Sequence, residues 1–245
     1  MCGRYLIISS PEAIRQFFQY PEQPNFPARY NVAPTQPIPI VRLAEGRRQF
    51  ALVRWGLIPA WVKDPRAFSL LINARGESVN DKPAFRNAMK RRRCLIPADG
   101  FFEWKDQGGK KRPYVVRPRS SGPIAFAGLW ESWMGPNGEE METAAIITTD
   151  ASSDVAHIHH RMPVIVPPDA FDLWLDPHVD AVTATALIVP APAGLLEAHE
   201  ISTAVNRVVN DSPALIDPAA AQQELAPELK PSKKPKKDER QRSLF

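Results

Sequence analysis

The sequence predicts an α+β fold in which a few helices flank a mostly antiparallel, barrel-like sheet. Short apolar segments with strand-like alternation, separated by turn residues, account for most of the first 170 positions. The candidate helices are too few and too unevenly placed for a repeated strand-helix-strand pattern. No repeat of solenoid or propeller spacing is visible. With 245 residues, 44% of them hydrophobic, the chain can bury the core of one domain.

The elements follow from local signals. MCGRYLIIS predicts a strand that begins at Cys2, and Ser10, Pro11 and Glu12 then start a helix that runs to about Phe18. Residues 21–39 are rich in proline and predict an irregular loop, and residues 38–43 and 50–57 predict a hairpin. Further strands are predicted at 93–96, 101–105, 114–117, 124–133, 143–148 and 163–166, and further helices at 83–90, 152–157, 169–175 and 179–186.

A change of composition divides the chain into one domain and a tail. We predict a domain over residues 1–225, with Met1 removed from the mature form, and a disordered basic tail over residues 226–245. The tail contains the run KPSKKPKKDER and has too few apolar residues to form a core.

The charge is unevenly distributed along the sequence. Residues 1–120 hold 22 Lys and Arg against 9 Asp and Glu, whereas residues 121–227 hold 2 against 15. Either the first half forms a positive surface for a polyanion, or the two halves interleave and neutralise each other. No apolar run is long enough to span a bilayer, and no secretory signal is present. Two cysteines cannot form a disulfide framework, so we expect a reducing, cytoplasmic, nucleoid-associated location without membrane contact.

Cys2 is the residue with the most distinctive chemistry. Removal of Met1 would leave an amino-terminal cysteine, whose α-amine and thiol titrate near about 8 and 8.5. An aldehyde can form an imine with this amine, after which the thiol closes a thiazolidine ring. The simpler interpretation is a frayed terminus without function. Cys94, in the run CLIPA, is predicted to be a buried small apolar residue.

Several motifs in order resemble a known family. They are MCGRY, RYNVAPTQ, WGLIPAW, INARGES, CLIPADGFFEWK, IHHRMPVIV and ISTAVNRVVND. Together they resemble the SRAP family (SOS response-associated peptidase), whose members sense abasic sites in DNA. The resemblance implies that Cys2 forms a thiazolidine crosslink with the ring-opened abasic sugar in single-stranded DNA and so shields the lesion. Lyase and autoproteolytic activities are implied as side reactions.

The reaction needs two proton carriers, because the closed sugar must be protonated at its ring oxygen and the amine must lose a proton. The resemblance implies that Glu103 works at the amine, that His159 works at the ring oxygen and imine, and that the Asn73 amide holds the amine or a sugar hydroxyl. The alternatives without catalytic function are a solvated strand carboxylate for Glu103, a surface histidine for His159 and an Asx turn for Asn73. The H-x-H-H spacing lacks the companions of a zinc site, so we predict neither metal nor cofactor. His160 departs from the acid or amide that family members often have.

The family positions that contact DNA match other residues of this chain. Arg4 and Arg75 fit phosphate contacts, because a guanidinium binds phosphate oxygens in pairs. Asn31 is expected to support the Cys2 pocket at the DNA interface. Pro34 and Trp61 match positions that wedge or stack at the lesion, although core packing is the ordinary role of a tryptophan. Val62 stands where the family often has a second aromatic residue.

The last five residues, QRSLF, resemble the peptide by which bacterial DNA-metabolism proteins bind the sliding clamp, with Gln241, Leu244 and Phe245 as anchors. The alternative is that the lysines of the tail attract DNA without specificity.

The sequence therefore predicts a monomer that captures abasic sites in single-stranded DNA through Cys2. Two alternatives stay open at this point: a thiol peptidase or amidohydrolase with Cys2 as nucleophile, and a noncovalent single-stranded nucleic-acid module.

Overall fold

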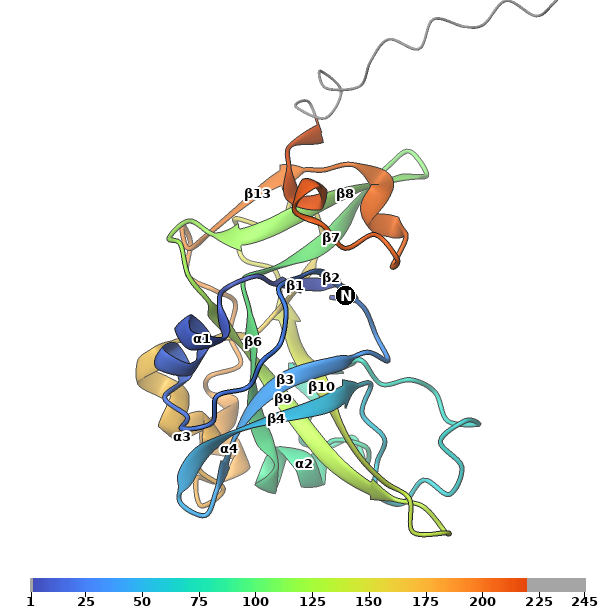
Figure 1. The fold of residues 1–245 in the computed structure, drawn as a ribbon, viewed down its shortest axis with the longest axis vertical. Coiled ribbons are helices and arrows are strands. Elements are labelled where there is room, and N and C mark those ends of the chain that lie inside the picture. Colours follow the sequence, from blue (N-terminus) through green and yellow to red (C-terminus); the bar gives the residue numbers. More distant parts are fainter. Residues whose placement is uncertain (1, 220–245) are drawn as a thin grey trace, which may run out of the picture.

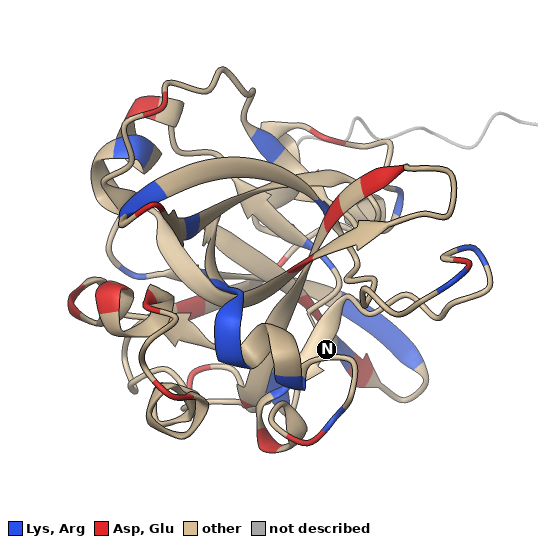
Figure 2. Ribbon diagram, turned by 90° about the horizontal axis from the view of Figure 1, so that it is seen from below, with Lys and Arg blue, Asp and Glu red and all other residues tan. Residues whose placement is uncertain are grey.

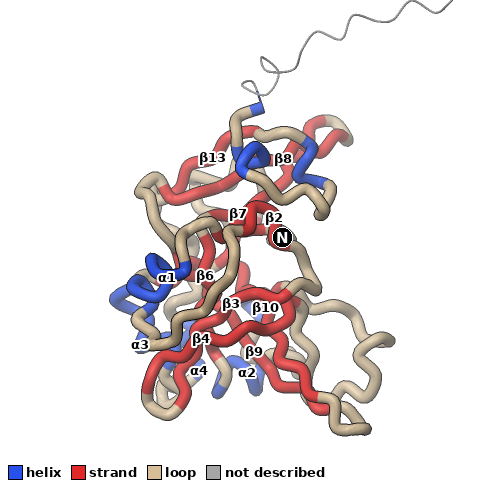
Figure 3. Tube along the Cα trace, in the orientation of Figure 1, coloured by secondary structure: helices blue, strands red, loops and turns tan. Residues whose placement is uncertain are grey.

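The structure is a computed structural model that describes residues 2–219. Two sheets and a small number of peripheral helices make up the fold (Figure 1). Strands and loops dominate the trace, as Figure 3 shows. The predicted α+β class is confirmed.

The first sheet has five antiparallel strands in the order β13-β8-β7-β1-β2. Their bounds are Leu196–Glu200 for β13, Lys110–Pro118 for β8, Gly100–Gln107 for β7, Tyr5–Ile7 for β1 and Arg29–Val32 for β2. The amino-terminal strand β1 thus lies inside the sheet. Its neighbours are β7, from the middle of the chain, and β2, which follows β1 closely in sequence.

The second sheet closes on itself. Pairings run from β10 to β4, β3, β6 and β9 and then back to β10, which makes a five-stranded barrel. These strands are β3 (Pro37–Ala44), β4 (Arg47–Trp55), β6 (Arg93–Ala98), β9 (Ile124–Met134) and β10 (Glu140–Asp150). The short strands β5 (Asn73–Arg75), β11 (Arg161–Pro163) and β12 (Ile165–Val166) extend it. The pairs of β10 with β4 and β5 are parallel, and the other described pairs are antiparallel, so the mostly antiparallel, barrel-like core is also confirmed.

The helices are short and lie outside the barrel. They are α1 (Pro11–Phe18), α2 (Arg86–Arg91), α3 (Phe171–Leu175) and α4 (Ala181–Thr185), with 3-10 turns at Gly76–Ser78, Pro168–Ala170, Thr203–Asn206 and Pro213–Ile216. The side chain of Ser10 accepts a hydrogen bond from the N–H of Ala13 and so caps α1, as predicted. The helix ends where Gln19 adopts a left-handed conformation.

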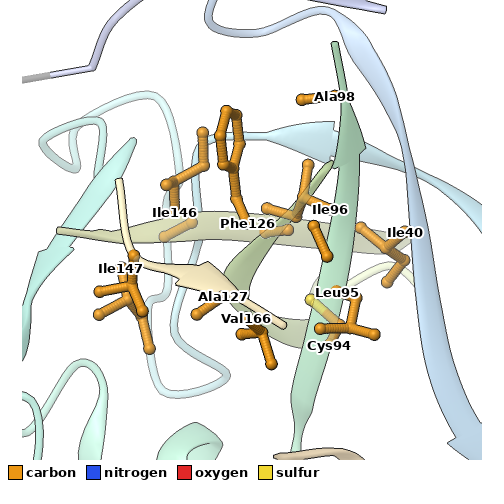
Figure 4. Close-up of a cluster of buried hydrophobic side chains, with 14 of the residues drawn as sticks. Ile40, Cys94, Leu95, Ile96, Ala98, Phe126, Ala127, Ile146, Ile147 and Val166 are labelled. Atoms are coloured by element: carbon orange, nitrogen blue, oxygen red, sulfur yellow. The ribbon is translucent and has the colours of Figure 1, made fainter. Parts of the chain in front are cut away.

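The core fills the barrel and continues between the two sheets. Figure 4 shows buried side chains of β3, β6, β9, β10 and β12 in one cluster, which includes Phe126 and the sulfur of Cys94. Tyr5 of the first sheet makes edge-to-face ring contacts with Trp55 and Phe126 of the second sheet. Because these rings are fully buried, they fix the amino-terminal strand against the barrel. Cys94 is a buried apolar residue, as predicted.

Some of the element predictions are wrong. The helix predicted over 152–157 is absent, and residues 153–158 form consecutive turns instead. The Asp154 carboxylate accepts hydrogen bonds from the N–H groups of Gly194 and Leu196 and so ties this segment to a distant loop. The predicted loop 21–39 contains β2 and the start of β3, and β13 was not predicted. The predicted strand 163–166 is divided between β11 and β12.

The unequal charges of the two halves of the sequence mix in space. Ion pairs join basic residues of the first 120 positions to acidic residues beyond them: Arg29–Asp211, Arg42–Glu142, Arg48–Asp172, Arg92–Glu131, Arg112–Glu200 and Arg119–Glu197. Figure 2 shows red and blue segments next to each other on both sides of the fold. The interleaved arrangement, one of the two that the sequence allowed, therefore describes this domain.

Candidate functional site

Cys2 lies beside β7, three positions before β1, which begins at Tyr5 and not at Cys2 as predicted. The N–H of Phe102 donates to the carbonyl of Arg4 over 3.0 Å, which extends the β1–β7 ladder toward the amino terminus. The Cys2 side chain is fully buried, and its sulfur lies 3.8 Å from the same carbonyl of Arg4. Glu103, which follows on β7, is 2% exposed. The sheet therefore holds the chain start next to a buried carboxylate.

Asn73 reaches Cys2 from the barrel. Its Nδ2 donates to the Cys2 carbonyl over 2.8 Å, and its Oδ1 is buried without a hydrogen-bond partner among the described residues. Asn73 is the first residue of β5, which runs parallel to β10 with Asn73 opposite Ile146. A buried amide oxygen in this situation is ready to accept a donor from a ligand.

His159 comes from the segment between β10 and β11. Its Nδ1 lies 4.0 Å from Oε2 of Glu103. The same Nδ1 is 3.0 Å from the backbone N–H of Arg161 and 3.1 Å from its carbonyl oxygen, so either tautomer has a backbone partner that fixes the ring. Cys2, Asn73, Glu103 and His159, which four separate segments supply, thus form one cluster, here called the Cys2 cluster.

Burial shifts the proton affinities within the Cys2 cluster. Loss of water raises the pKa of Glu103 from 4.5 to about 7, and it lowers the pKa of His159 below its ordinary 6.5. Burial, and then the charge of Glu103, also raises the pKa of the Cys2 thiol. Near neutral pH the cluster therefore holds a protonated thiol, a neutral imidazole and a carboxyl group that can give or take a proton.

Arg4 and Asn31 occupy a different environment from the Cys2 cluster. The NH1 group of Arg4 donates to Oδ1 of Asn31 and to the carbonyl of Val205, over 2.7 and 2.8 Å. The Asn31 amide nitrogen donates toward the carbonyls of Val205, Arg207 and Asn210. We call Arg4, Asn31 and these three carbonyl groups the latch, because they fasten the amino-terminal strands to residues 205–210.

The other predicted DNA contacts are more accessible. Arg75, at the end of β5, is exposed. Pro34 is half-buried, and Trp61 is 58% exposed with its ring edge-to-face on Phe68. Thr35 and Phe68 line one cavity of about 380 Å³, so the segments that carry Pro34 and Trp61 border a common hollow. Val62 is buried beside Ile58 and Trp133 and offers no stacking surface.

A charged group that sequence reasoning missed lies next to the Cys2 cluster. Arg161 is 8% exposed and forms ion pairs with Glu77 and Asp150. The motifs INARGES and IHHRMP contain Glu77 and Arg161, but no sequence pattern shows that they meet. Within residues 2–219, no three His, Cys, Asp or Glu side chains are arranged to hold a metal ion. No helix in that range could cross a membrane.

Comparison with known proteins identifies the family. The family model described as SOS response associated peptidase (SRAP) matches residues 1–208. The chain belongs to the SRAP family. It is 39% identical over 222 residues to the abasic site processing protein YoqW of Bacillus subtilis, covering 89% of this chain and 99% of that one. The abasic site processing protein YedK of Escherichia coli is 30% identical over 229 residues, covering 89% and 100%.

Solved SRAP-like structures share the fold. A crystal structure of a protein from Bacteroides thetaiotaomicron matches with a TM-score of 0.79 and 28% identity, covering 89% of this chain and all of that one. A protein from Bordetella bronchiseptica matches with a TM-score of 0.72 and 27% identity, covering 82% and 100%. Gln241, Leu244 and Phe245, together with the predicted tail 226–245, lie outside the described residues.

Proposed function

We propose that this protein captures abasic sites in single-stranded DNA by forming a thiazolidine with the α-amine and thiol of Cys2. The observation that carries the proposal is the Cys2 cluster, in which one amide binds the Cys2 backbone while a buried carboxyl group and an imidazole lie 4.0 Å apart. The names of the relatives YoqW and YedK, abasic site processing proteins, support the choice of substrate.

The proton affinities favour an order of steps. The buried thiol is protonated near neutral pH, whereas a free α-amine titrates near about 8 and is partly neutral. The amine therefore attacks the aldehyde carbon first, and water leaves as the imine forms. The sulfur then adds to the imine carbon, the thiol proton passes to the nitrogen, and the ring closes without loss of a further group.

Two members of the Cys2 cluster move the protons. Glu103, with a pKa of about 7, accepts a proton from the ammonium form of Cys2 and can return it to the departing oxygen. His159 is a neutral imidazole at rest because its pKa is lowered; once it has taken up a proton, its imidazolium is a stronger acid than usual and can pass that proton to the sugar ring oxygen. Asn73 holds the Cys2 carbonyl with its nitrogen and offers its oxygen to the amine or to a sugar hydroxyl.

The DNA strand needs contacts with the protein beyond the reacting sugar. We assign a contact with a DNA backbone phosphate to Arg75. Arg75 is exposed at the end of β5, two residues after Asn73. Pro34 and Trp61 are suited to fill the space of the missing base or to stack on its neighbours. Thr35, next to Pro34, and Phe68, which the Trp61 ring contacts, line the same hollow.

The predicted clamp contact is a separate proposal about the carboxyl-terminal residues. A peptide that ends in QRSLF is expected to bind a purified bacterial sliding clamp, and a Leu244→Ala/Phe245→Ala peptide is expected not to bind. Equal binding by both peptides, or binding by neither, would remove the clamp from the proposal.

The deciding experiment mixes the purified protein with single-stranded DNA that carries one abasic site, without a reducing agent, and separates the products under denaturing conditions. A heat-resistant adduct is expected for the wild type and none for Cys2→Ala. The variant keeps an α-amine, so strand cleavage through an imine is expected to persist.

The same variant separates the two alternatives. A peptidase would lose turnover on a peptide substrate in Cys2→Ala, and a noncovalent module would keep its DNA affinity and show no adduct in either form. An adduct that appears only after borohydride reduction would contradict the thiazolidine.

A further inference from the structure

His160 contacts His159 of the Cys2 cluster and also lines the pocket that contains Arg75. Its ring stacks on the ring of His159, with centroids 4.5 Å apart and planes 25° apart. It also lines a polar pocket of about 410 Å³ together with Arg75, Ser78 and Arg161. The carbonyl of His160 accepts a hydrogen bond from the N–H of Ala151, which fixes the backbone at this point.

The charges that face this pocket nearly cancel. Arg75 and Arg161 contribute two positive charges, and Glu77 and Asp150, which also line it, contribute two negative charges. Arg161 is already paired with both carboxylates, whereas Arg75 has no ion pair within the described part of the chain. His160 is the remaining titratable group of the lining, so its proton decides whether the pocket is neutral or positive.

We propose that His160 is a positioning residue that completes a phosphate-binding pocket with Arg75 and Ser78 and couples the occupancy of this pocket to His159. The inference rests on the proposed function, because the phosphate in question belongs to the strand that carries the lesion. It adds to that function a proton-linked contact at His160.

The coupling follows from the stacked rings. A phosphate in the pocket favours the protonated form of His160, and a cation 4.5 Å from the His159 ring opposes protonation of His159. Two unit charges at this separation in water shift each other's titration by about 0.7 pH unit. Linkage is reciprocal, so protonation of His159 weakens phosphate binding by the same factor.

Other charged groups also act on His159 and must be held constant. Glu103 of β7 faces it at 4.0 Å, Lys111 of β8 adds to the lowering of its pKa that burial causes, and Arg161 contacts it through the backbone. Replacement of His160 changes none of these groups. The effect of His160 on His159 can therefore be measured by one substitution.

The test follows the histidine side chains directly by NMR in the full-length protein labelled with ¹⁵N-histidine. His160→Gln is compared with His157→Gln, a matched control because His157 is exposed on the same segment. The titration midpoint of His159 is expected to rise by about 0.7 pH unit in His160→Gln and to stay unchanged in His157→Gln. Equal midpoints in all three proteins would overturn the coupling.

A second arm tests the pocket. The probe is a single-stranded oligonucleotide with a tetrahydrofuran abasic analogue, which has no aldehyde and cannot crosslink. It is expected to raise the midpoint of His160 and lower that of His159, and Arg75→Ala is expected to abolish both changes. Inorganic phosphate at the same phosphate concentration distinguishes the sources: an effect of the oligonucleotide alone supports a strand phosphate, and an equal effect of both contradicts it.

These readouts do not depend on adduct formation. Loss of the wild-type adduct together with an intact His159 shift would contradict the proposed function and leave the coupling in place. A normal adduct with no midpoint change on DNA binding would contradict the pocket and leave the proposed function in place.

Discussion

Asn31 and Asn73 are amides near the same amino-terminal strand, and the structure uses them in opposite ways. Asn31 is fully buried, its oxygen accepts from Arg4, and its nitrogen meets three carbonyl groups of residues 205–210. Asn73 makes one hydrogen bond to Cys2 and keeps a buried oxygen without a described partner. The latch is satisfied internally, whereas the Cys2 cluster keeps polar capacity for a ligand.

The same distinction separates the buried charges. Arg93, 3% exposed, donates to the carbonyls of Met89, Trp174, Asp176 and Val179, so its charge serves to join α2 and α3 to the barrel. Glu103 is equally buried, and burial raises its pKa to about 7. A buried charge whose hydrogen bonds all go to backbone groups indicates a structural role. A buried group whose pKa is shifted toward 7 indicates a role in proton transfer.

The largest expected effect belongs to Glu103→Gln. If Glu103 moves protons, the rate of adduct formation should fall by about 10²- to 10⁴-fold, the usual contribution of general acid–base catalysis. Rates are measured from quenched time courses with DNA in excess. The matched control is Glu131→Gln, a buried carboxylate that is paired with Arg92 far from the Cys2 cluster. A similar loss of rate in both variants would attribute the effect to folding.

Glu103 should also leave a signature in stability. Its pKa is higher in the folded protein, about 7, than in the unfolded chain, near 4.5, so the folded state binds the extra proton. The contribution of Glu103 to the free energy of unfolding should therefore be greatest below pH 4.5. It should decline by about 3 kcal/mol as the pH rises to 7. Chemical denaturation of the wild type and Glu103→Gln across this range should show the decline in the wild type alone.

Asn31→Ala and Asn73→Ala sharpen the comparison of the two amides. Loss of Asn31 leaves buried carbonyl groups without donors and should reduce the free energy of unfolding by about 3 kcal/mol, or about 6–12 °C in melting temperature. Loss of Asn73 should change stability by less than about 1 kcal/mol and slow adduct formation by up to about 100-fold. The reverse pattern, in thermal unfolding and adduct rates, would exchange the roles assigned to the two regions.

The smallest expected effect concerns salt. Arg75→Ala should flatten the logarithmic dependence of single-strand affinity on salt by about 0.7, the value for one lost phosphate contact. Arg4→Ala, which breaks the latch, should act mainly through stability and should leave this slope closer to that of the wild type. Fluorescence anisotropy with a tetrahydrofuran oligonucleotide between low and moderate salt measures both slopes, and an unchanged slope in Arg75→Ala would place this arginine outside the interface.

The sequence predicted the parts of the fold that local alternation determines. The hairpin of β3 and β4 and the long strands β7, β9 and β10 have strong patterns, whereas β2, β5 and β13 are short and depend on partners distant in sequence. Motif resemblance pointed to Asn73, Glu103 and His159, but only the placement of β5 and β11 along β10 brings Asn73 and His159 toward Glu103. The motifs did not indicate that Asn31 and Arg4 bind each other.

The most direct test of the account counts thiols in the crosslinked protein. The adduct with abasic single-stranded DNA is formed without reduction, denatured, treated with iodoacetamide and measured by intact mass. The chain has two cysteines, Cys2 and Cys94. A thiazolidine predicts one alkylated cysteine, a protein part without Met1 and the loss of one water on crosslinking. Two alkylated cysteines in the stable adduct would contradict the central role of the Cys2 thiol.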